Sequence, residues 1–241
     1  PRVSTRRPVS STGAKRGYYF SRTRSVDTDL RWEGSSNVFT GITRGVFPVV
    51  QLDRKADLLR YAVAFPDDLG RGLEVGASVS IDGVCQTVTG IEGTAVHFDA
   101  IAETLDRTTL GELQLGQRVA VERSAKVGDE VGGHDVSGHV IGTGTIRARR
   151  AEGHSCDLEI AVSTEWMKYI SVKGFVAVDG SSLTVGECAS GGGFWVHLIP
   201  ETLRLTRLGE KVEGDRVNIE LDARTVSIVD TVERSLLERG H

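Results

Sequence analysis

The chain has 241 residues, of which 39% are hydrophobic and 26% are charged, a balance that is ordinary for a folded protein and excludes disorder throughout. It contains no apolar run close to the ~20 residues of a membrane helix and no apolar signal region at its start, so we expect a protein that is neither secreted nor embedded in a membrane. The formal net charge of −4 combines +5 in residues 1–37 with −9 in residues 38–241, and an acidic folded part excludes a nucleic-acid surface.

Residues 1–37 precede the predicted fold. They contain eight basic and three acidic residues, no acidic residue occurs before Asp27, and no apolar periodicity is present. This composition predicts a segment that is unstructured on its own. Two explanations stay open: an organelle transit peptide, which is typically rich in Arg and Ser, or a leader translated from upstream of a start codon at Val38.

An internal repeat begins at Phe39. Residues 39–42 match residues 136–139, and residues 79–88 match residues 176–185, both at an offset of 97. One inserted residue, expected in the loop of residues 191–193, changes the offset to 98, and matches between residues 103–122 and 201–220 follow. Three blocks in one order with a single insertion indicate that one structural unit occurs twice.

Each copy is predicted to consist of short antiparallel strands. Asp82-Gly83 and Asp179-Gly180 are strong two-residue hairpin signals between alternating apolar residues. Residues 103–110 and 201–208 are the only segments with a helical pattern in either copy. Many short strands with glycine-rich turns favour a closed or nearly closed antiparallel barrel, because closure removes exposed strand edges.

The chain ends in a predicted amphipathic helix over residues 225–238. Val229, Val232 and Leu236 follow the spacing of a narrow apolar stripe, with Leu237 beside it and Gly240 just beyond the end. Two explanations stay open: the helix packs on its own barrel, or it associates with other copies of the chain. Two heptads are too few to decide.

The three cysteines, Cys85, Cys156 and Cys188, are far apart and form no C-x-x-C pair. This argues against a disulfide framework or a zinc site and fits a reducing compartment. Cys85 occupies in the first copy the position of Ser182 in the second. Taken alone, Cys85 is more often a buried structural thiol and Ser182 a turn hydroxyl, but their equivalence in the repeat favours a role at paired sites.

Two histidines, His134 and His139, lie five residues apart outside any predicted helix. That spacing is poor for a metal site, so taken alone each is most simply a surface or hydrogen-bonded residue.

Six segments in the same order resemble the riboflavin synthase family. They are Phe39-Thr40-Gly41-Ile42, Asp82-Gly83-Val84-Cys85-Gln86-Thr87-Val88, the Gly132-Gly133-His134-Asp135-Val136-Ser137-Gly138-His139 stretch, residues 173–185, His197-Leu198-Ile199-Pro200-Glu201-Thr202-Leu203 and Val217-Asn218-Ile219-Glu220. The resemblance covers essentially the whole chain after residue 38. The family starts with Met at the position of Val38, which favours the translated leader and a cytoplasmic location.

The resemblance implies an all-β fold of two tandem Greek-key antiparallel barrels, residues 38–134 and 135–223, followed by an oligomerisation helix over residues 224–241. In that family each barrel binds one 6,7-dimethyl-8-ribityllumazine. A four-carbon unit passes between the two molecules, giving riboflavin and 5-amino-6-ribitylaminouracil without a metal or other cofactor. The resemblance further implies a homotrimer whose sites form between the first barrel of one subunit and the second barrel of a neighbour, with lumazine synthase as a candidate partner.

The resemblance also assigns residues to two pockets. The first would be lined by Gly41, Ile42, Thr43, Cys85, Gln86, Thr87, Asp99, Ala100, Ile101, Ala102, Glu103 and Thr104. The second would be lined by Gly138, His139, Val140, Lys173, Ser182, Leu183, Thr184, Ile199, Pro200, Glu201, Thr202, Leu203 and Arg204.

The catalytic roles implied by the resemblance fall on five residues. We expect His139 and Ser182 with Thr184 to handle protons and activate water, and Cys85 to contact the acceptor. Asp179 has a functional role only by resemblance, since it is most simply a turn residue. The effective molarity of two ligands held face to face would supply much of the rate, and modest acids and bases the remainder.

The sequence departs from the family pattern at three positions. Asp82 replaces a common Asn, Gln86 a common Leu, and Ser181 a small apolar residue. Gln86 would place an amide at the first pocket, which puts the details of ligand binding there in doubt.

Two other functions compete with the enzyme. A non-catalytic lumazine or flavin carrier of the same fold would not need two intact polar sites. A flavin reductase barrel would need a nucleotide-binding α/β domain, which the sequence pattern lacks.

Overall fold

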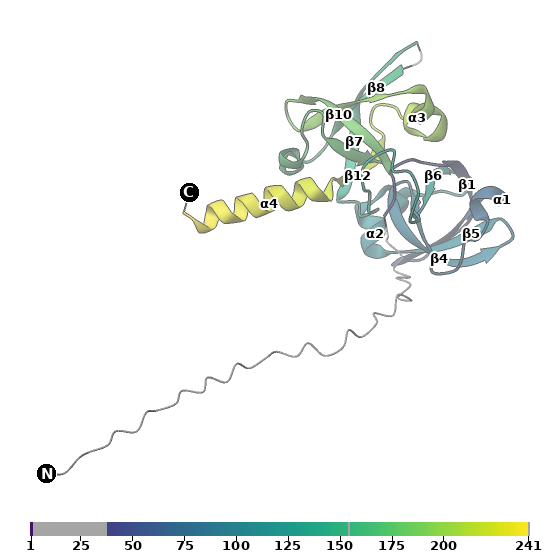
Figure 1. The fold of residues 1–241 in the computed structure, drawn as a ribbon. Coiled ribbons are helices and arrows are strands. Elements are labelled where there is room, and N and C mark those ends of the chain that lie inside the picture. Colours follow the sequence, from purple (N-terminus) through teal and green to yellow (C-terminus); the bar gives the residue numbers. More distant parts are fainter. Residues whose placement is uncertain (2–37, 154, 241) are drawn as a thin grey trace. The chain divides into compact units, whose positions relative to one another are not determined.

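The computed structural model describes Pro1, residues 38–153 and residues 155–240, and residues 2–37 lie outside it, so the two explanations for residues 1–37 are not addressed by the structure. Two closed six-stranded antiparallel barrels follow one another, and the C-terminal helix comes after them (Figure 1). The predicted all-β fold of two tandem barrels plus a helix is confirmed.

The first barrel has the strand order β1-β2-β5-β4-β3-β6, so β2 and β3, which are consecutive in sequence, are separated in the sheet as in a Greek key. Its elements are β1 (Gly45–Arg54), β2 (Leu58–Ala64), α1 (Asp67–Gly70), β3 (Ser78–Ile81), β4 (Val84–Glu92), β5 (Ala95–Ile101), α2 (Ala102–Arg107), η1 (Thr109–Glu112) and β6 (Arg118–Arg123).

The second barrel repeats this order with equivalent strands. Its elements are β7 (Gly142–Glu152), β8 (Ser155–Ala161), η2 (Thr164–Tyr169), β9 (Phe175–Val178), β10 (Ser181–Ala189), β11 (Gly193–Leu198), α3 (Pro200–Leu205), η3 (Leu208–Glu210) and β12 (Arg216–Leu221), and α4 (Ala223–Glu238) follows.

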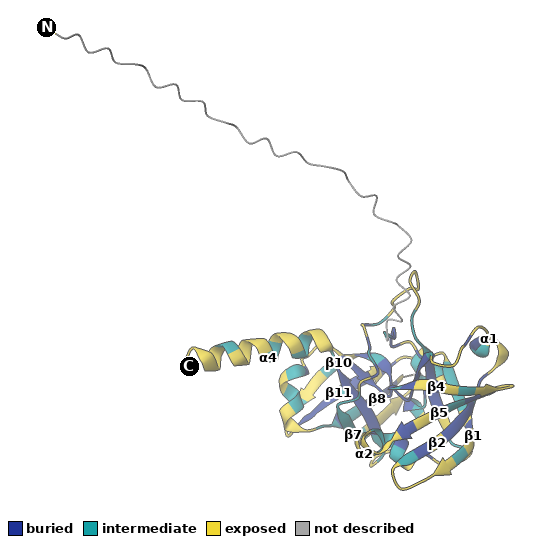
Figure 2. Ribbon diagram, turned by 90° about the horizontal axis from the view of Figure 1, so that it is seen from below, coloured by how far each residue is buried: buried dark blue, intermediate teal, exposed yellow. Residues whose placement is uncertain are grey.

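Each barrel encloses its own apolar core. Tyr61, Phe65 and Phe98 fill the first with tilted ring contacts, and Phe194 with Ile160 fills the second. The strands alternate between buried and exposed residues (Figure 2), because successive side chains of a strand point to opposite faces. One face of each strand therefore builds the core, and the other is free to form sites on the outside of the barrel.

The Asp-Gly hairpins form as predicted. Asp82 and Gly83 join β3 to β4 with φ of 45° and 84°, and Asp179 and Gly180 join β9 to β10 with φ of 44° and 80°. Positive φ at both central residues is the type I′ turn, whose twist matches that of the flanking strands.

The inserted residue lies where the repeat placed it. Residues 93–94 connect β4 to β5, whereas residues 190–192 connect the equivalent β10 to β11. The expectation that residues 103–110 and 201–208 are the only helical segments of the copies is wrong, because α1 and η2 add short helices at equivalent positions. Each is only four to six residues long, too short for an apolar periodicity to mark it.

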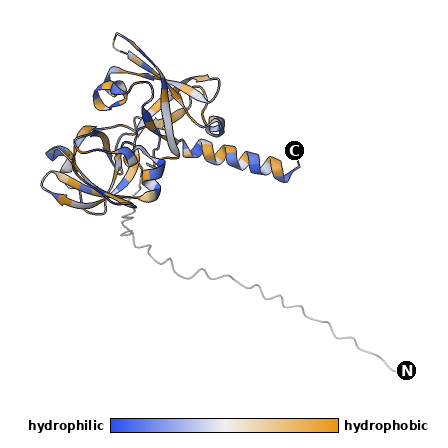
Figure 3. Ribbon diagram, turned by 180° about the vertical axis from the view of Figure 1, so that it is seen from behind, coloured by the Kyte–Doolittle hydropathy of each residue, from blue (hydrophilic) through white to orange (hydrophobic). Residues whose placement is uncertain are grey.

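Helix α4 leaves most of its apolar stripe in solvent. Of the predicted residues, Val232 and Leu236 are 51% and 47% exposed and Val229 is half-buried, while Ile228 extends the exposed part at 64%. Figure 3 shows apolar residues recurring along the helix. The contacts of α4 with the second barrel lie elsewhere: Asp230 accepts a 2.6 Å hydrogen bond from the Tyr169 hydroxyl, and Glu233 accepts one of 2.5 Å from Lys168 Nζ. No helix among the described residues combines the length and apolarity needed to cross a bilayer.

Candidate functional site

Two short segments join the barrels. Residues 39–43 precede β1 and residues 136–140 precede β7, and we call them the first and second leading segments. Phe39 and Val136 pair as an antiparallel bridge, with N–H···O distances of 2.6 and 3.0 Å, and both side chains are buried. The equivalent ends of the two copies are therefore in direct contact.

Each leading segment then lies against the barrel of the other copy. The backbone N–H of Cys85 in β4 donates to the carbonyl oxygen of Gly138 at 2.9 Å, and that of Ser182 in β10 donates to Gly41, also at 2.9 Å. Both glycines have positive φ, and a Cβ on Gly138 or Gly41 would lie 2.6 or 2.5 Å from the Cβ of Cys85 or Ser182. Only glycine allows this close approach.

The first barrel carries a cavity of about 220 Å³ on its outer face. It is open to solvent and brings together residues from β4, α2 and the second leading segment: Val84, Cys85, Glu103, Thr104, Arg107, Thr108, Gly138, His139 and Val140. The sequence grouped Cys85 and Thr104 with one pocket and His139 with the other. The structure instead places all three around a single cavity, because the leading segments are exchanged between the barrels.

Cys85 is half-buried at this cavity. Burial raises the pKa of its thiol, the Ser78 hydroxyl lowers that pKa, and the negative charge of Glu220 raises it further. The thiol is therefore protonated at neutral pH and is suited to contact or hydrogen-bond a ligand rather than to attack it as a thiolate.

Gln86 does not reach the cavity. It points into the barrel, where it accepts a 3.3 Å hydrogen bond from the Tyr61 hydroxyl and donates one of 2.9 Å to the Cys85 carbonyl. Strand alternation explains this, since Cys85 and Thr87 share the outer face of β4 and Gln86 shares the inner face with Val88. The departure at Gln86 thus changes the core rather than the cavity wall.

A second constellation forms on the outer face of the second barrel. The Oγ atom of Ser182 lies 2.6 Å from Nδ1 of His134 and accepts a 3.1 Å hydrogen bond from the His134 backbone N–H. Gly41 of the first leading segment covers the same serine. A hydroxyl held between a backbone donor and an imidazole is a good position for proton transfer.

His134 is held rigidly beside Ser182. Its ring stacks on Phe175 of β9 at 5.3 Å with an interplanar angle of 17°, and burial lowers its pKa. The imidazole is therefore neutral at pH 7 and can accept a proton. Its Nε2 atom is buried and has no hydrogen-bond partner among the described residues. Taken alone, His134 was expected to be a surface or hydrogen-bonded residue, and the structure shows the hydrogen-bonded alternative.

The other predicted residues of the second site lie around this pair or on its flank. Thr184 is exposed on the same face of β10 as Ser182, and Leu183 between them points into the core. Lys173 is exposed in the turn before β9 with φ of 66°. Thr43, which was predicted for the first site, is buried instead beside the second barrel, with its hydroxyl 3.3 Å from that of Ser181. Residues 199–204 form the N-cap and most of α3, where Glu201 pairs with Arg204 at 2.6 Å.

The remaining predicted residues of the first site lie outside the cavity wall. Asp99 on β5 is paired with Arg60 at 3.4 Å, and Ala100 is buried in the barrel core. Ile101 and Ala102 are exposed where β5 meets α2, and Ile42 is exposed in the first leading segment.

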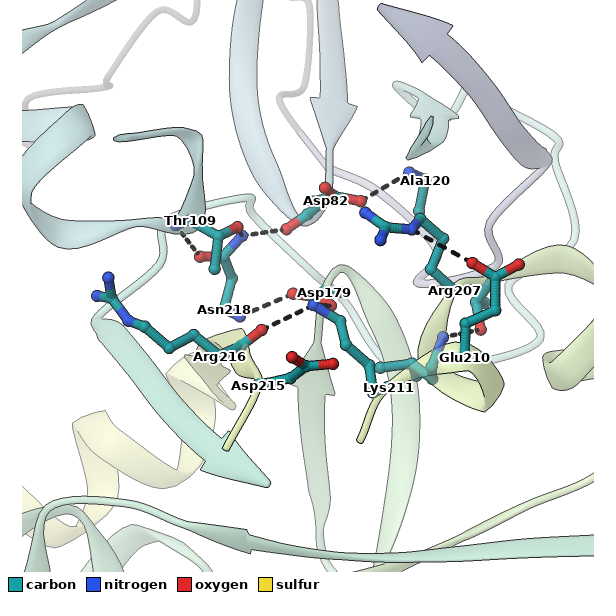
Figure 4. Close-up of polar contacts among 12 residues, drawn as sticks. Asp82, Thr109, Ala120, Asp179, Arg207, Glu210, Lys211, Asp215, Arg216 and Asn218 are labelled. Atoms are coloured by element: carbon teal, nitrogen blue, oxygen red, sulfur yellow. Dashed lines mark hydrogen bonds and ion pairs between the residues drawn. The ribbon is translucent and has the colours of Figure 1, made fainter. Parts of the chain in front are cut away.

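Asp179 lies in a different place, where the two hairpins meet (Figure 4). Its Oδ1 atom accepts a 2.7 Å hydrogen bond from the Asn218 backbone N–H, and its Oδ2 atom lies 3.7 Å from Lys211 Nζ. Asp82 makes the equivalent bond to the Ala120 N–H at 2.7 Å, and a Cβ on Gly83 would lie 2.4 Å from the Gly180 nitrogen. This buried junction connects the barrels and is separate from the Cys85 cavity.

The Asp82 carboxyl is strongly perturbed at this junction. Burial and the nearby charge of Asp179 raise its pKa to about 7, although the Ala120 hydrogen bond and the cations Lys211 and Arg207 lower it. Burial also raises the pKa of Asp179, against the same two cations. The charge of Asp179 thus disfavours the ionised form of Asp82. The contacts of Asp179 with Asn218 and Lys211 give it a structural role in joining the barrels.

Comparisons with known proteins agree with this architecture. The lumazine binding domain family matches twice, at residues 40–124 and 137–222. Riboflavin synthase of Escherichia coli (strain K12) is 47% identical over 203 residues, which cover 84% of this chain and 95% of that protein. Riboflavin synthase of Chlamydia pneumoniae is 40% identical over 203 residues, with 84% and 99% covered.

Solved structures show the same fold at lower identity. LumP complexed with riboflavin superimposes with a TM-score of 0.71 at 24% identity, covering 76% of this chain and 99% of that chain. LumP complexed with 6,7-dimethyl-8-(1'-D-ribityl) lumazine gives a TM-score of 0.69 at 23% identity.

Two barrels in tandem, with a polar site on the outer face of each, define a protein of the duplicated lumazine-binding class. Within that class, the chain belongs to the riboflavin synthase family, whose members are transferases.

Proposed function

We propose that the chain catalyses the dismutation of two molecules of 6,7-dimethyl-8-ribityllumazine, in which a four-carbon unit passes from one to the other. The products, riboflavin and 5-amino-6-ribitylaminouracil, together contain all atoms of the two substrates, so the reaction needs no external oxidant or reductant. The observation that carries the proposal is the pair of equivalent sites: one reaction that uses the same compound as donor and acceptor needs two similar binding sites.

The two sites differ in the chemistry that they offer. At the second barrel, the neutral imidazole of His134 and the Ser182 hydroxyl can remove a proton or activate water. At the first barrel, Cys85 and His139 face one cavity with Thr104. This division supports a donor and an acceptor with unequal roles, one losing a proton from its C7 methyl group and the other accepting a nucleophile at C7.

The two ligands have to lie face to face for the four-carbon transfer. We propose that they do so between subunits of a homotrimer, with the first barrel of one subunit against the second barrel of the next. The exposed apolar residues of α4, namely Ile228, Val232, Leu236 and Leu237, support an association through this helix. Lumazine synthase, which would supply the substrate, remains a candidate partner.

Incubation of the purified full-length chain with the ribityllumazine tests the proposal. Growth of riboflavin absorbance and fluorescence, with one riboflavin formed for every two substrate molecules consumed, is the expected result. Binding of the ribityllumazine without any riboflavin formation would overturn the proposal and favour a carrier of the same fold.

A further inference from the structure

Two equivalent glutamates, Glu122 in β6 and Glu220 in β12, are almost completely buried, at 4% and 6% exposure. A buried carboxylate is costly unless hydrogen bonds compensate for its lost hydration, so its partners indicate what it does. In both cases the partners belong to a leading segment rather than to a neighbouring strand.

Glu220 fixes three consecutive residues of the second leading segment. Its Oε1 atom accepts hydrogen bonds from the Ser137 backbone N–H at 2.6 Å and from the Ser137 hydroxyl at 2.7 Å, and its Oε2 atom accepts one from the Gly138 N–H at 2.9 Å. The Ser137 oxygen in turn accepts a 3.2 Å hydrogen bond from the His139 N–H. One carboxylate therefore sets the backbone that places His139 at the cavity with Cys85.

Glu122 holds the first leading segment in a parallel way. Its Oε1 atom accepts 2.7 Å hydrogen bonds from both the N–H and the hydroxyl of Thr40, whose oxygen accepts one from the Ile42 N–H at 3.2 Å. This segment lies against Ser182, not Cys85. Each glutamate thus belongs to one barrel and shapes the site on the other.

We propose that Glu220 is a positioning residue for the first-barrel site and Glu122 its counterpart for the second-barrel site. The inference rests on the proposed function for its effect on turnover, but the arrangement itself predicts changes that can be measured without turnover. Glu220 acts through the backbone of Ser137 and Gly138, makes no hydrogen bond to the Cys85 side chain and is not itself among the residues that line the cavity.

The reactivity of Cys85 gives a direct readout. In a background with the exposed Cys188 replaced by serine, the cavity thiol Cys85 is more accessible than Cys156, which is 2% exposed in the core. Glu220→Gln leaves the Gly138 N–H without its acceptor, so the segment that covers Cys85 should loosen. We expect iodoacetamide alkylation of Cys85, followed by peptide mass spectrometry, to accelerate at least fivefold in Glu220→Gln and to change less than twofold in Glu122→Gln.

One further variant, Ser137→Ala, separates the positioning of the second leading segment from the charge of Glu220 and from the stability of the chain. Glu220→Gln also removes a charge that raises the pKa of Cys85. Ser137→Ala keeps that charge and the backbone hydrogen bonds of Ser137 and Gly138 to Glu220, and it removes the hydroxyl that bridges Glu220 and the His139 N–H. We therefore expect Ser137→Ala to accelerate alkylation about twofold to threefold. Ser137→Ala also decides the question if Glu220→Gln fails to fold, as judged by its thermal melting curve.

Turnover and binding complete the test. Glu220→Gln is expected to lower kcat at least tenfold while thermal melting stays cooperative, and titration with riboflavin should show one weakened site of two per chain. Equal rates of Cys85 alkylation in all three variants would overturn the inference. An equal loss of riboflavin affinity at both sites in each variant would also overturn it. An inactive wild-type chain that still shows the alkylation contrast would refute the proposed function alone.

Discussion

Cys85 and Ser182 occupy equivalent positions in the two barrels, and the backbone N–H of each donates a 2.9 Å hydrogen bond to the other copy's leading segment, at Gly138 and Gly41 respectively. The backbone framework of the two sites is thus the same, while the side chains differ. A protonated thiol faces one site and a hydroxyl bonded to a neutral imidazole faces the other. Duplication followed by change at a few outward-facing positions accounts for two sites with unequal chemistry.

Replacing Ser182 with alanine tests the more polar of the two sites. The change removes the oxygen that lies 2.6 Å from His134 Nδ1, so proton transfer at this site loses its relay. We expect kcat for riboflavin formation to fall by about 100-fold, the usual scale of general acid–base contributions. Stability should change little because Ser182 is only partly buried on the outer face of β10.

Thr89→Ala provides the control for Ser182→Ala, since Thr89 is an exposed hydroxyl residue of β4 that lies outside the Cys85 cavity. It should retain full activity. If Ser182→Ala kept more than half of the wild-type kcat, the Ser182–His134 pair would have a binding or structural role only.

The stripe on α4 predicts a link between assembly and activity. Val232→Asp places a charge in the middle of Ile228, Val232 and Leu236, which are all at least 47% exposed. If this stripe is buried between subunits, the charge would have to be desolvated, at a cost of several kcal/mol per subunit. We expect light scattering to show a monomer and riboflavin formation to be lost with the oligomer.

Ser227→Asp is the matched control for Val232→Asp, because Ser227 is exposed on the opposite side of the same helix. It should preserve the oligomer. A monomeric but fully active Val232→Asp variant would contradict the assembly of sites between subunits.

The fold could be predicted from the sequence for two reasons. The repeat shows that one unit occurs twice, and each Asp-Gly hairpin is a local signal that sets the pairing of the two strands beside it. The pairing of Ile81 with Val84, and of Val178 with Ser181, follows from a two-residue turn alone. The longer turn in the second copy could likewise be placed from the change in offset.

The grouping of the site residues could not be obtained in this way. His139 follows the first barrel in sequence by 16 residues and precedes the second by three, so its position gave no sign that it faces Cys85. That arrangement depends on the Phe39–Val136 bridge, a contact between residues 97 apart. The one available signal was the close-packing glycine in each leading segment, which marks where another backbone approaches.

Asn218 breaks the symmetry of the junction, and its removal should destabilise the chain. Its side chain donates to the Asp82 carbonyl at 2.7 Å and to the Thr109 hydroxyl at 2.8 Å, and it accepts from the Thr109 N–H at 2.8 Å. Asn218→Ala leaves these buried groups without a partner. We expect urea unfolding to show that Asn218→Ala lowers the free energy of unfolding by about 1–3 kcal/mol. The control Gln114→Ala, at an exposed residue, should lower it by less than about 0.5 kcal/mol.

A loss for Asn218→Ala as small as that of Gln114→Ala would mean that water replaces the amide at the junction. The barrels would then be joined mainly by their leading segments and the contact between the two hairpin glycines.

Asp82 gives the junction a predicted dependence on pH. Its pKa is about 7 in the folded chain, raised from an ordinary value of 3.8 by burial and by Asp179. Between these two values the folded chain keeps a proton that the unfolded chain has released. The contribution of Asp82 to the free energy of unfolding should therefore be fully present below about pH 4, fall as the pH rises through this window and level off above pH 7.

Asp82→Asn removes this titration and keeps an oxygen that can accept the 2.7 Å hydrogen bond from the Ala120 N–H. Its stability should therefore gain on that of the wild type as the pH rises from 5 to 8, by about 2–4 kcal/mol at the upper end. Urea unfolding at several pH values measures this, with the exposed Asp68→Asn on α1 as a variant whose curve should follow the wild type. Parallel curves for Asp82→Asn and the wild type from pH 5 to 8 would show that Asp82 stays ionised in the folded chain. The repulsion between the carboxyls of Asp82 and Asp179 would then have to be weaker than their burial at this junction implies.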